Sequence, residues 1–315
     1  MSEREIVCAD LGAALDELRS QGFRIDIIYP ADDPHTATLS RGVERVRVTS
    51  RPEAPPVSAE MPPLVPEFLL TRADGAPAQG RAGMLYRDLI PGRLGGRYVA
   101  SHITTPGGGP VDDWVHFHHV ALQLIFVARG WVRVVYEDQG EPFVMEAGDL
   151  VLQPPGIRHR VLESSPGLEV VEIGCPALHE THADHEMELP NAALDKSRLF
   201  SGQRFLHHVA RAAPWQALHG GEAQETALKL ASGGLAEART IRPGAVSEIA
   251  FPAHDGELAF GFVIEGEARL EMAGTHDLGS GDAFVIPPGR ECRLDRMTLG
   301  FRLLQVLASV PGPAA

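Results

Sequence analysis

Residues 116–130 read HFHHVALQLIFVARG and place three histidines ahead of an apolar run. Side chains alternate between the two faces of a β-strand, so His116 and His118 share one face and His119 points to the other. Two imidazoles on one face are a candidate pair of metal ligands. The first eight residues do not by themselves distinguish a metal site from buried histidines, because a metal site needs a further ligand from elsewhere in the chain.

A further ligand is available in GDLVLQPPGIRH, residues 148–159. The Pro-x-Gly turn at 154–156 bends the chain, and we expect His159 on a separate strand after it. Between the histidines of the two segments, Gln123 follows His118 by five residues and Gly130 follows Gln123 by seven. The two segments therefore supply three imidazoles and one amide as candidate ligands.

The chain contains an internal repeat of strand-rich sequence. FVARGWVRVVYE (126–137) is similar to FVIEGEARLEMA (262–273), and AGDLVLQPPGIRHRV (147–161) is similar to SGDAFVIPPGRECRL (280–294). Short runs rich in Val, Ile and Phe alternate with Gly, Pro and Asp turns, which is typical of an all-β protein. The repeat predicts two β domains of one fold, each of about 90 to 100 residues.

These segments resemble the two motifs of the cupin superfamily. The first motif is HxH, three or four residues, Glu, six residues and Gly, and Gln123 stands here where the family usually has Glu. The second is Gly, five residues, PxG, two residues, His, three residues and Asn, and Glu163 stands in the Asn place. The resemblance covers well over half of the chain and leaves out the first 80 residues. It implies an all-β bicupin, two jelly-roll barrels, with a small α/β N-terminal appendage.

In that family His116, His118 and His159 would bind one divalent metal, with Gln123 in the place of the carboxylate. Three imidazoles and an amide would leave the 2+ charge uncompensated, so we expect a small anionic or metal-chelating substrate. Fe(II) is favoured, and Zn, Ni and Mn stay open because His and Gln ligands suit all four. Tyr136, Gln153, Trp131 and Arg158 are candidate substrate-binding residues. The alternative is a metal-free barrel with buried histidines.

The second half departs from the pattern. Alignment on Gly266 and Gly281 puts Pro252, His254, Ala259 and Cys292 at the four ligand positions. Proline and alanine cannot coordinate through their side chains, so we expect a degenerate barrel kept for packing and assembly. A second ligand pocket that uses His254, Glu257 and Cys292 is the alternative.

The rest of the chain is less informative. DLGAALDELRSQ (10–21) predicts a helix capped by Asp10, and 23–30 and 43–50 predict strands. PALHETHADHE (176–186), with His179, His182 and His185, is not a metalloprotease motif, and we expect a solvated connector there. The predicted domains are an appendage with a Pro-rich connector (1–83), metal-binding barrel 1 (84–176), a connector with some helix (177–225) and degenerate barrel 2 (226–315).

Composition limits the class of protein. The net charge of −14 over 315 residues argues against nucleic acid or an anionic membrane as a partner. The three cysteines are far apart and form no disulfide framework, and the N-terminus lacks a signal-peptide pattern. We expect a cytoplasmic protein and, because cupins often pair, a homo-oligomer.

Three functions are consistent with these features. The resemblance extends to the gentisate and hydroxynaphthoate ring-cleaving dioxygenases, bicupins that use three histidines without a carboxylate ligand. It implies a mononuclear non-haem Fe(II) dioxygenase that acts on a small aromatic or carbonyl acid. The alternatives are a redox-neutral cupin isomerase, cyclase or lyase using Zn, Ni or Mn, and a non-enzymatic small-acid-binding protein.

Overall fold

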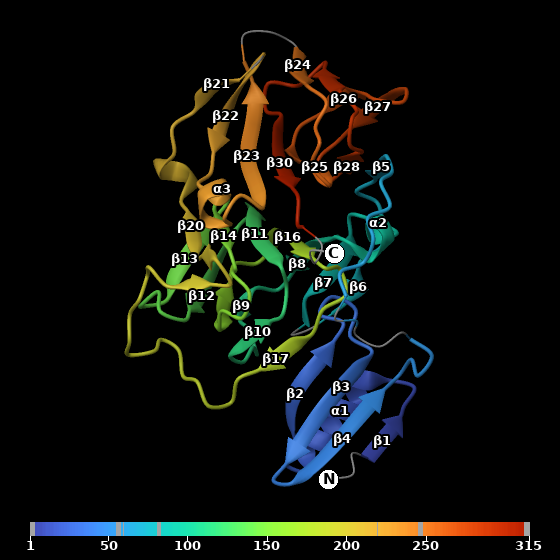
Figure 1. Cartoon of the computed structure of the whole chain (residues 1–315), viewed down its shortest axis with the longest axis vertical. Coiled ribbons are helices and arrows are strands. Elements are labelled where there is room, and N and C mark those ends of the chain that lie inside the picture. The colour runs from blue at the N-terminus through green and yellow to red at the C-terminus, as the bar shows by residue number, and fades with distance from the viewer. Residues whose placement is uncertain are drawn as a thin grey trace.

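The computed structural model describes residues 4–54, 58, 60–80, 83–218, 220–244 and 248–311. An N-terminal appendage, barrel 1 and barrel 2 follow one another along the longest axis (Figure 1). Strands dominate all three parts, as the predicted all-β class requires. None of the helices in the described part of the chain is long and apolar enough to cross a membrane.

The appendage is a four-stranded sheet with one helix. It contains β1 (Arg4–Val7), α1 (Leu11–Ser20), β2 (Arg24–Tyr29), β3 (Thr36–Arg41) and β4 (Glu44–Thr49). The carboxylate of Asp10 accepts a hydrogen bond from the amide of Ala13 at 3.1 Å and caps the helix, as expected. Leu11 and Leu18 of α1 pack against Leu39 and Val48 of the sheet. The predicted helix and two strands are confirmed, whereas β1 and β3 were not predicted.

Barrel 1 is built from two sheets. In the first sheet the strands have the order β17-β10-β15-β12-β13, and β9 also pairs with β15. Their bounds are β17 (Thr181–Ala183), β10 (His116–His118), β15 (His159–Ser164), β12 (Trp131–Tyr136), β13 (Phe143–Glu146) and β9 (Gly109–Pro110). The second has the order β20-β14-β11-β16-β8-β7-β6: β20 (Leu206–His208), β14 (Leu150–Leu152), β11 (Leu122–Arg129), β16 (Leu168–Cys175), β8 (Val99–Thr105), β7 (Leu85–Asp88) and β6 (Ala78–Gln79). The short helix α2 (Arg93–Gly96) precedes β8.

Barrel 2 repeats this arrangement. Its larger sheet has the order β21-β22-β23-β30-β25-β28-β5: β21 (Gln216–Leu218), β22 (Gly221–Glu225), β23 (Ala236–Pro243), β30 (Arg302–Ala308), β25 (Leu258–Glu265), β28 (Ala283–Ile286) and β5 (Leu69–Thr71). Its smaller sheet has the order β24-β29-β26-β27: β24 (Glu248–Phe251), β29 (Cys292–Asp295), β26 (Ala268–Glu271) and β27 (Thr275–Leu278). The short helix α3 (Leu228–Ala231) packs on β23.

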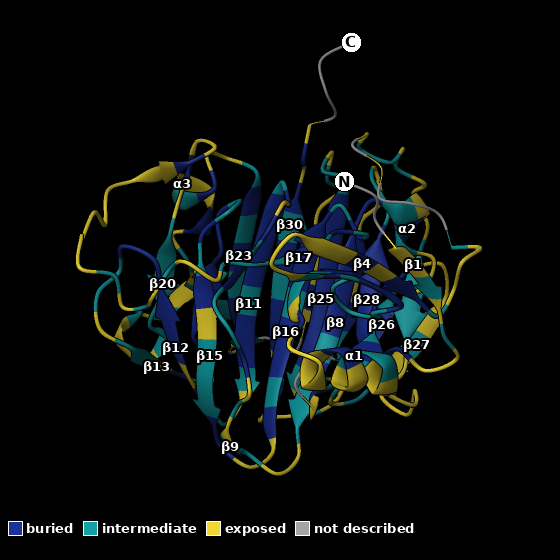
Figure 2. Ribbon diagram, turned by 90° about the horizontal axis from the view of Figure 1, so that it is seen from below, coloured by how far each residue is buried: buried dark blue, intermediate teal, exposed yellow. Residues whose placement is uncertain are grey.

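The two seven-stranded sheets pack against each other and form the largest apolar core. Leu122 and Leu124 of β11 belong to the same buried cluster as Phe260 of β25. The intervening residues of β11, Gln123 and Ile125, line the cavity inside barrel 1. Figure 2 shows the buried strands β8, β11, β16, β25 and β30 gathered in the middle of the molecule. Strand alternation thus divides β11 between the inter-barrel core and the interior of barrel 1.

The segment 177–225 differs from the predicted connector with some helix. Its described residues contain β17, β20, β21 and β22, the hairpin β18 (Leu199–Phe200) and β19 (Gln203–Arg204), and one short 3₁₀ turn, η2 (Ala210–Ala212). β17 pairs with both β10 and β2, so the appendage sheet continues into barrel 1. β5 and β6 likewise add strands to the two barrels from within 1–83. The predicted domain limits stay a prediction.

Candidate metal centre

His116, His118 and His159 converge inside barrel 1. His116 and His118 lie on β10, and His116 is in register with His159 on the neighbouring antiparallel β15. One ring nitrogen from each lies within 4.8 Å of the others. The three side chains are buried, with exposed fractions of 1%, 7% and 5%. The structure therefore brings together the three histidines that the spacing singled out.

The Nδ1 atom of each ring faces a backbone carbonyl. Nδ1 of His116 lies 2.7 Å from the carbonyl oxygen of Trp114, Nδ1 of His118 lies 3.2 Å from that of Glu180, and Nδ1 of His159 lies 3.1 Å from that of Ile157. A carbonyl oxygen only accepts hydrogen bonds, so each Nδ1 is the donor nitrogen, and in a neutral ring Nε2 is then the nitrogen that can bind a metal. Metal-binding histidines are typically oriented in this way. The donor set fits a divalent metal.

A carboxylate supports one of these histidines. Asp113 Oδ1 lies 3.6 Å from Nδ1 of His116, and Oδ2 accepts a hydrogen bond from the amide of Val161 at 2.9 Å. The side chain of Asp113 is fully buried. Carboxylates behind ligand histidines fix the ring and raise its basicity. The sequence analysis missed Asp113, although its position three residues before His116 was a signal.

Gln123 lines the same cavity but is engaged by a second missed carboxylate. Its Nε2 donates a hydrogen bond of 2.6 Å to Oε1 of Glu172 on β16. Glu172 lines the cavity beside the histidines. The expectation that the metal's charge would be uncompensated took no account of this carboxylate beside the site, and the expectation stays untested. An acidic residue between the apolar Val171 and Ile173 in the strand LEVVEIG was the available signal.

The cavity itself is small and mostly apolar. Its volume is about 100 Å³. Tyr136 and Gln153 line it, and the Tyr136 hydroxyl lies 2.5 Å from Oε1 of Gln153. Burial, with a smaller contribution from the charge of Glu172, raises the pKa of Tyr136, so its hydroxyl stays protonated at neutral pH. The other lining residues are Met84, Tyr86, Ile103, Thr105, Ile125, Val132, Val134, Met145, Val161, Ser164, Leu168 and Val170.

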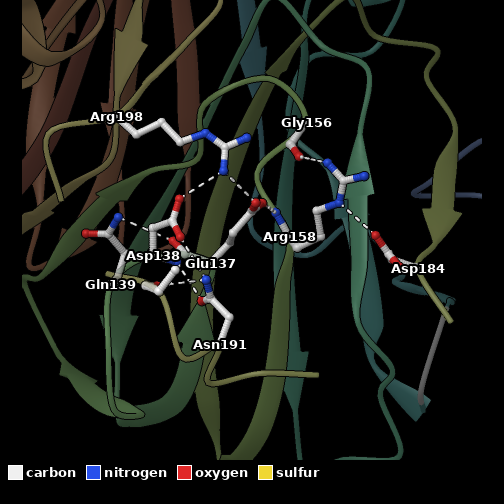
Figure 3. A network of polar contacts seen from close by, with 9 residues as sticks. Glu137, Asp138, Gln139, Gly156, Arg158, Asp184, Asn191 and Arg198 are labelled. Atoms are coloured by element: carbon white, nitrogen blue, oxygen red, sulfur yellow. Dashed lines mark hydrogen bonds and ion pairs between the residues drawn. The ribbon is translucent and has the colours of Figure 1, made fainter. Parts of the chain in front are cut away.

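Arg158 and Trp131, the other two candidate substrate-binding residues, do not line this cavity. The Nε of Arg158 donates to Asp184 at 2.9 Å, and its guanidinium lies over the ring of Phe117. In Figure 3 Arg158 points from the turn before His159 toward Asp184. The amide of Arg158 also donates to Glu137 at 3.1 Å. Arg158 thus helps to fix the turn that carries His159.

The same figure shows how residues near 191–198 attach to barrel 1. Nη1 of Arg198 donates to the carboxylates of Glu137 and Asp138 at 2.7 and 2.9 Å, and Asn191 bonds to Asp138 (Figure 3). Glu137 thereby connects this segment to the turn before His159. The network holds the end of β12 and the turn together.

The histidine-rich segment 176–186 is not a solvated connector. His179 is 3% exposed, and β17 begins two residues later between β10 and β2. Burial lowers the pKa of His179, so its ring is neutral near pH 7. The prediction was wrong because polar composition did not reveal that this segment pairs with two strands. His182 and His119 pack edge to face outside the histidine triad, with ring centroids 4.7 Å apart.

The described residues of barrel 2 hold no equivalent cluster. Among the described residues, His116, His118 and His159 form the only group of three such side chains close enough to share a metal. Pro252, His254, Ala259 and Cys292 line a separate cavity of about 290 Å³. Burial raises the pKa of Cys292 to about 12, which keeps the thiol protonated. Glu257, the third residue of the alternative pocket, instead bonds to Arg97 and Tyr98 of the barrel 1 side.

Comparisons with known proteins agree with this architecture. The cupin domain family matches the sequence twice, over residues 101–173 and 239–296. A comparison with curated proteins gave no significant match.

Similar solved structures include a salicylate 1,2-dioxygenase from Pseudaminobacter salicylatoxidans, with 18% identity and a TM-score of 0.58 over 79% of this chain and 86% of that chain. A mutant oxalate decarboxylase from Bacillus subtilis has 12% identity and a TM-score of 0.55 over 82% and 80%. At identities of 12% and 18%, the similarity shows a shared fold and nothing more. Both strand-rich halves are cupin domains, and the chain is a bicupin.

Proposed function

We propose that barrel 1 binds one divalent metal, preferably Fe(II), on His116, His118 and His159, and that the chain is a mononuclear non-haem dioxygenase. Its substrate would be a small aromatic or carbonyl acid that chelates the metal. The observation that carries the proposal is the buried convergence of three imidazoles whose Nδ1 atoms all face backbone carbonyls. When bound, the metal would supply Lewis acidity and, as iron, the redox chemistry that dioxygen requires.

The cavity walls narrow the substrate class. No lysine or arginine is among the described residues that line the cavity, so a carboxylate would depend on the metal for its charge partner. The protonated Tyr136 hydroxyl is available to hydrogen-bond a substrate oxygen if it leaves Gln153. A cavity of about 100 Å³ is smaller than the roughly 150 Å³ that accommodates benzene in an engineered protein. We therefore expect small carbonyl chelators to be better substrates than dihydroxybenzoates.

Glu172 gives a specific reason to retain the redox-neutral alternative. Its carboxylate lines the cavity and would serve as a general base beside a metal-bound carbonyl compound, as an isomerase or lyase requires. Such a reaction would proceed with Zn, Ni or Mn and without oxygen. The cytoplasmic location and the homo-oligomeric assembly stay predictions.

Oxygen uptake tests the proposal. Fe(II)-reconstituted protein would be mixed with 1,3-diketones and with dihydroxybenzoates, beside His159→Ala and the control His119→Ala, which removes a histidine outside the triad. Substrate-dependent uptake that His159→Ala loses and His119→Ala retains is expected. Anaerobic conversion by the Zn, Ni or Mn protein would instead support the redox-neutral reaction. Tight substrate binding without turnover by any metal form would support a binding protein.

A further inference from the structure

A second, smaller chamber lies where the N-terminal appendage meets barrel 1. Its volume is about 30 Å³, and Asp32 and His179 are among its lining residues. Tyr86, His118 and Glu172 line both this chamber and the main cavity. The chamber is therefore a polar compartment adjacent to the candidate metal centre, and the appendage contributes part of its wall.

Two buried hydrogen-bond acceptors in the chamber wall have no donor in the described part of the chain. Nδ1 of His179 lies 3.2 Å from the carbonyl oxygen of Pro176, so Nδ1 carries the proton and Nε2 of the neutral ring is an acceptor. Among the described residues, Nε2 of His179 and Oδ1 of Asp32 have no hydrogen-bond partner. The other carboxylate oxygen of Asp32 accepts from Arg93 at 2.6 Å. Buried acceptors of this kind are normally satisfied, often by ordered water.

The size and polarity of the chamber define its occupant. A water molecule requires roughly 10–15 Å³ of such volume, so the chamber has room for about two. The carboxylate of Glu172 adds a third acceptor group to the wall. Water can donate two hydrogen bonds and still accept others, which suits a compartment rich in acceptors. An anion would be repelled by the two carboxylates.

The chamber wall also holds His118 in place. The ring of His179 packs edge-on against that of His118, with centroids 5.3 Å apart and an interplanar angle of 89°. The next residue, Glu180, provides the carbonyl that faces Nδ1 of His118. The amide of Ala31 in the appendage donates to the carbonyl of His179 at 3.1 Å. A shift of His179 would therefore move the groups that orient a candidate metal ligand.

We propose that the chamber binds two ordered water molecules that donate hydrogen bonds to Asp32 and His179, and that this hydrated contact positions His118. Asp32 and His179 are positioning residues in this proposal, and the appendage becomes part of the metal site's support. The hydration does not depend on a bound metal, whereas the positioning role rests on the proposed metal-binding function.

A high-resolution crystal structure of the full chain tests the hydration. Two water peaks about 2.7–3.2 Å from Oδ1 of Asp32 and Nε2 of His179 are expected. An empty chamber would overturn the proposal. A single peak with several oxygen ligands at about 2.0–2.6 Å would also overturn it, because that geometry indicates a cation.

Cobalt binding tests the positioning role. Asp32→Asn keeps the shape of the side chain, His179→Phe removes the acceptor, and Asp33→Asn is the control because Asp33 pairs with Arg51 at the surface. We expect Co(II) to bind about 10-fold more weakly to the first two variants, with a shifted visible spectrum, and normally to the control.

Each result of the cobalt experiment has a separate meaning. Unchanged Co(II) affinity and spectra in folded Asp32→Asn and His179→Phe would refute positioning. If His179→Phe does not fold, Asp32→Asn alone gives the answer. Failure of the wild type to bind Co(II) would refute the proposed function, and positioning with it, whereas the crystallographic waters would still establish the chamber.

Discussion

Replacement of Arg97 by methionine would test how the two barrels are held together. Arg97 is 4% exposed and donates to both carboxylate oxygens of Glu257, at 3.1 and 2.6 Å. It also donates to the carbonyls of Pro62 and Val310. Methionine would keep most of the volume but leave the Glu257 charge and two carbonyls without this donor.

The expected loss is about 3 kcal/mol of unfolding free energy at pH 7. Removal of one partner from a buried ion pair typically costs about 3–5 kcal/mol, and the lower end applies because the Glu257 side chain is 23% exposed. The matched control is Arg293→Met, since Arg293 is 47% exposed in its pairs with Glu248 and Glu271. A surface pair of this kind contributes about 0–1 kcal/mol.

The pH dependence of the Arg97 effect has a defined sign. Burial alone would raise the pKa of Glu257, but hydrogen bonds from Arg97, Tyr98 and the amide of Val310 lower it overall. A pKa that is lower in the folded state stabilises the protein at pH values above the unfolded-state pKa of about 4.3. This stability is lost as the pH falls through the folded-state pKa. The difference between wild type and Arg97→Met should therefore shrink in acid.

Urea denaturation would measure these effects, with fluorescence and circular dichroism compared to establish whether the transition is two-state. The double variant Arg97→Met/Glu257→Gln should lose clearly less than the sum of the two single losses, because the stranded charge is gone. The reasoning would be refuted by a loss below about 1 kcal/mol for Arg97→Met, or by strict additivity in the double variant.

Three further predictions concern the metal site and the barrel turns. Glu172→Gln should weaken Zn²⁺ binding about 10-fold by calorimetry, because a carboxylate beside the site is lost; equal affinity would contradict that role. Gly130→Ala should lower the free energy of unfolding, measured by urea denaturation, by about 1–3 kcal/mol, because Gly130 has a φ of 77° and a Cβ there would lie 2.3 Å from Oγ of Ser165. The control Gly107→Ala should lower it far less, because the space around Gly107 is open. A chelator should lower the melting temperature of metal-loaded wild type but not of His159→Ala. Equal responses of the two proteins would contradict metal binding at His159.

Local sequence, together with the resemblance to the two cupin motifs, was sufficient to predict the histidine triad. His116 and His118 share a face because strands alternate, and the turn ahead of His159 is encoded by 154–156. The helix 11–20 was equally predictable from its cap and its apolar spacing.

The missed residues depend on pairing between distant strands. Glu172 reaches Gln123 because β16 lies beside β11, with Gln123 in register with Gly174. His179 is buried because β17 inserts between β10 and β2, which are separated by more than 80 residues in sequence. Neither register can be read from the composition of the segment itself. The same reason explains β5, a three-residue strand from the N-terminal region that completes the sheet of barrel 2.

The central claim is that three histidines of barrel 1 bind one metal. The most direct test is elemental analysis of anaerobically purified protein, with His159→Ala and His119→Ala beside the wild type. The account predicts one equivalent of divalent metal, iron if the dioxygenase proposal holds, in the wild type and in His119→Ala, and its loss in His159→Ala. Wild type that stays metal-free after reconstitution, or His159→Ala that keeps a full equivalent, would contradict it.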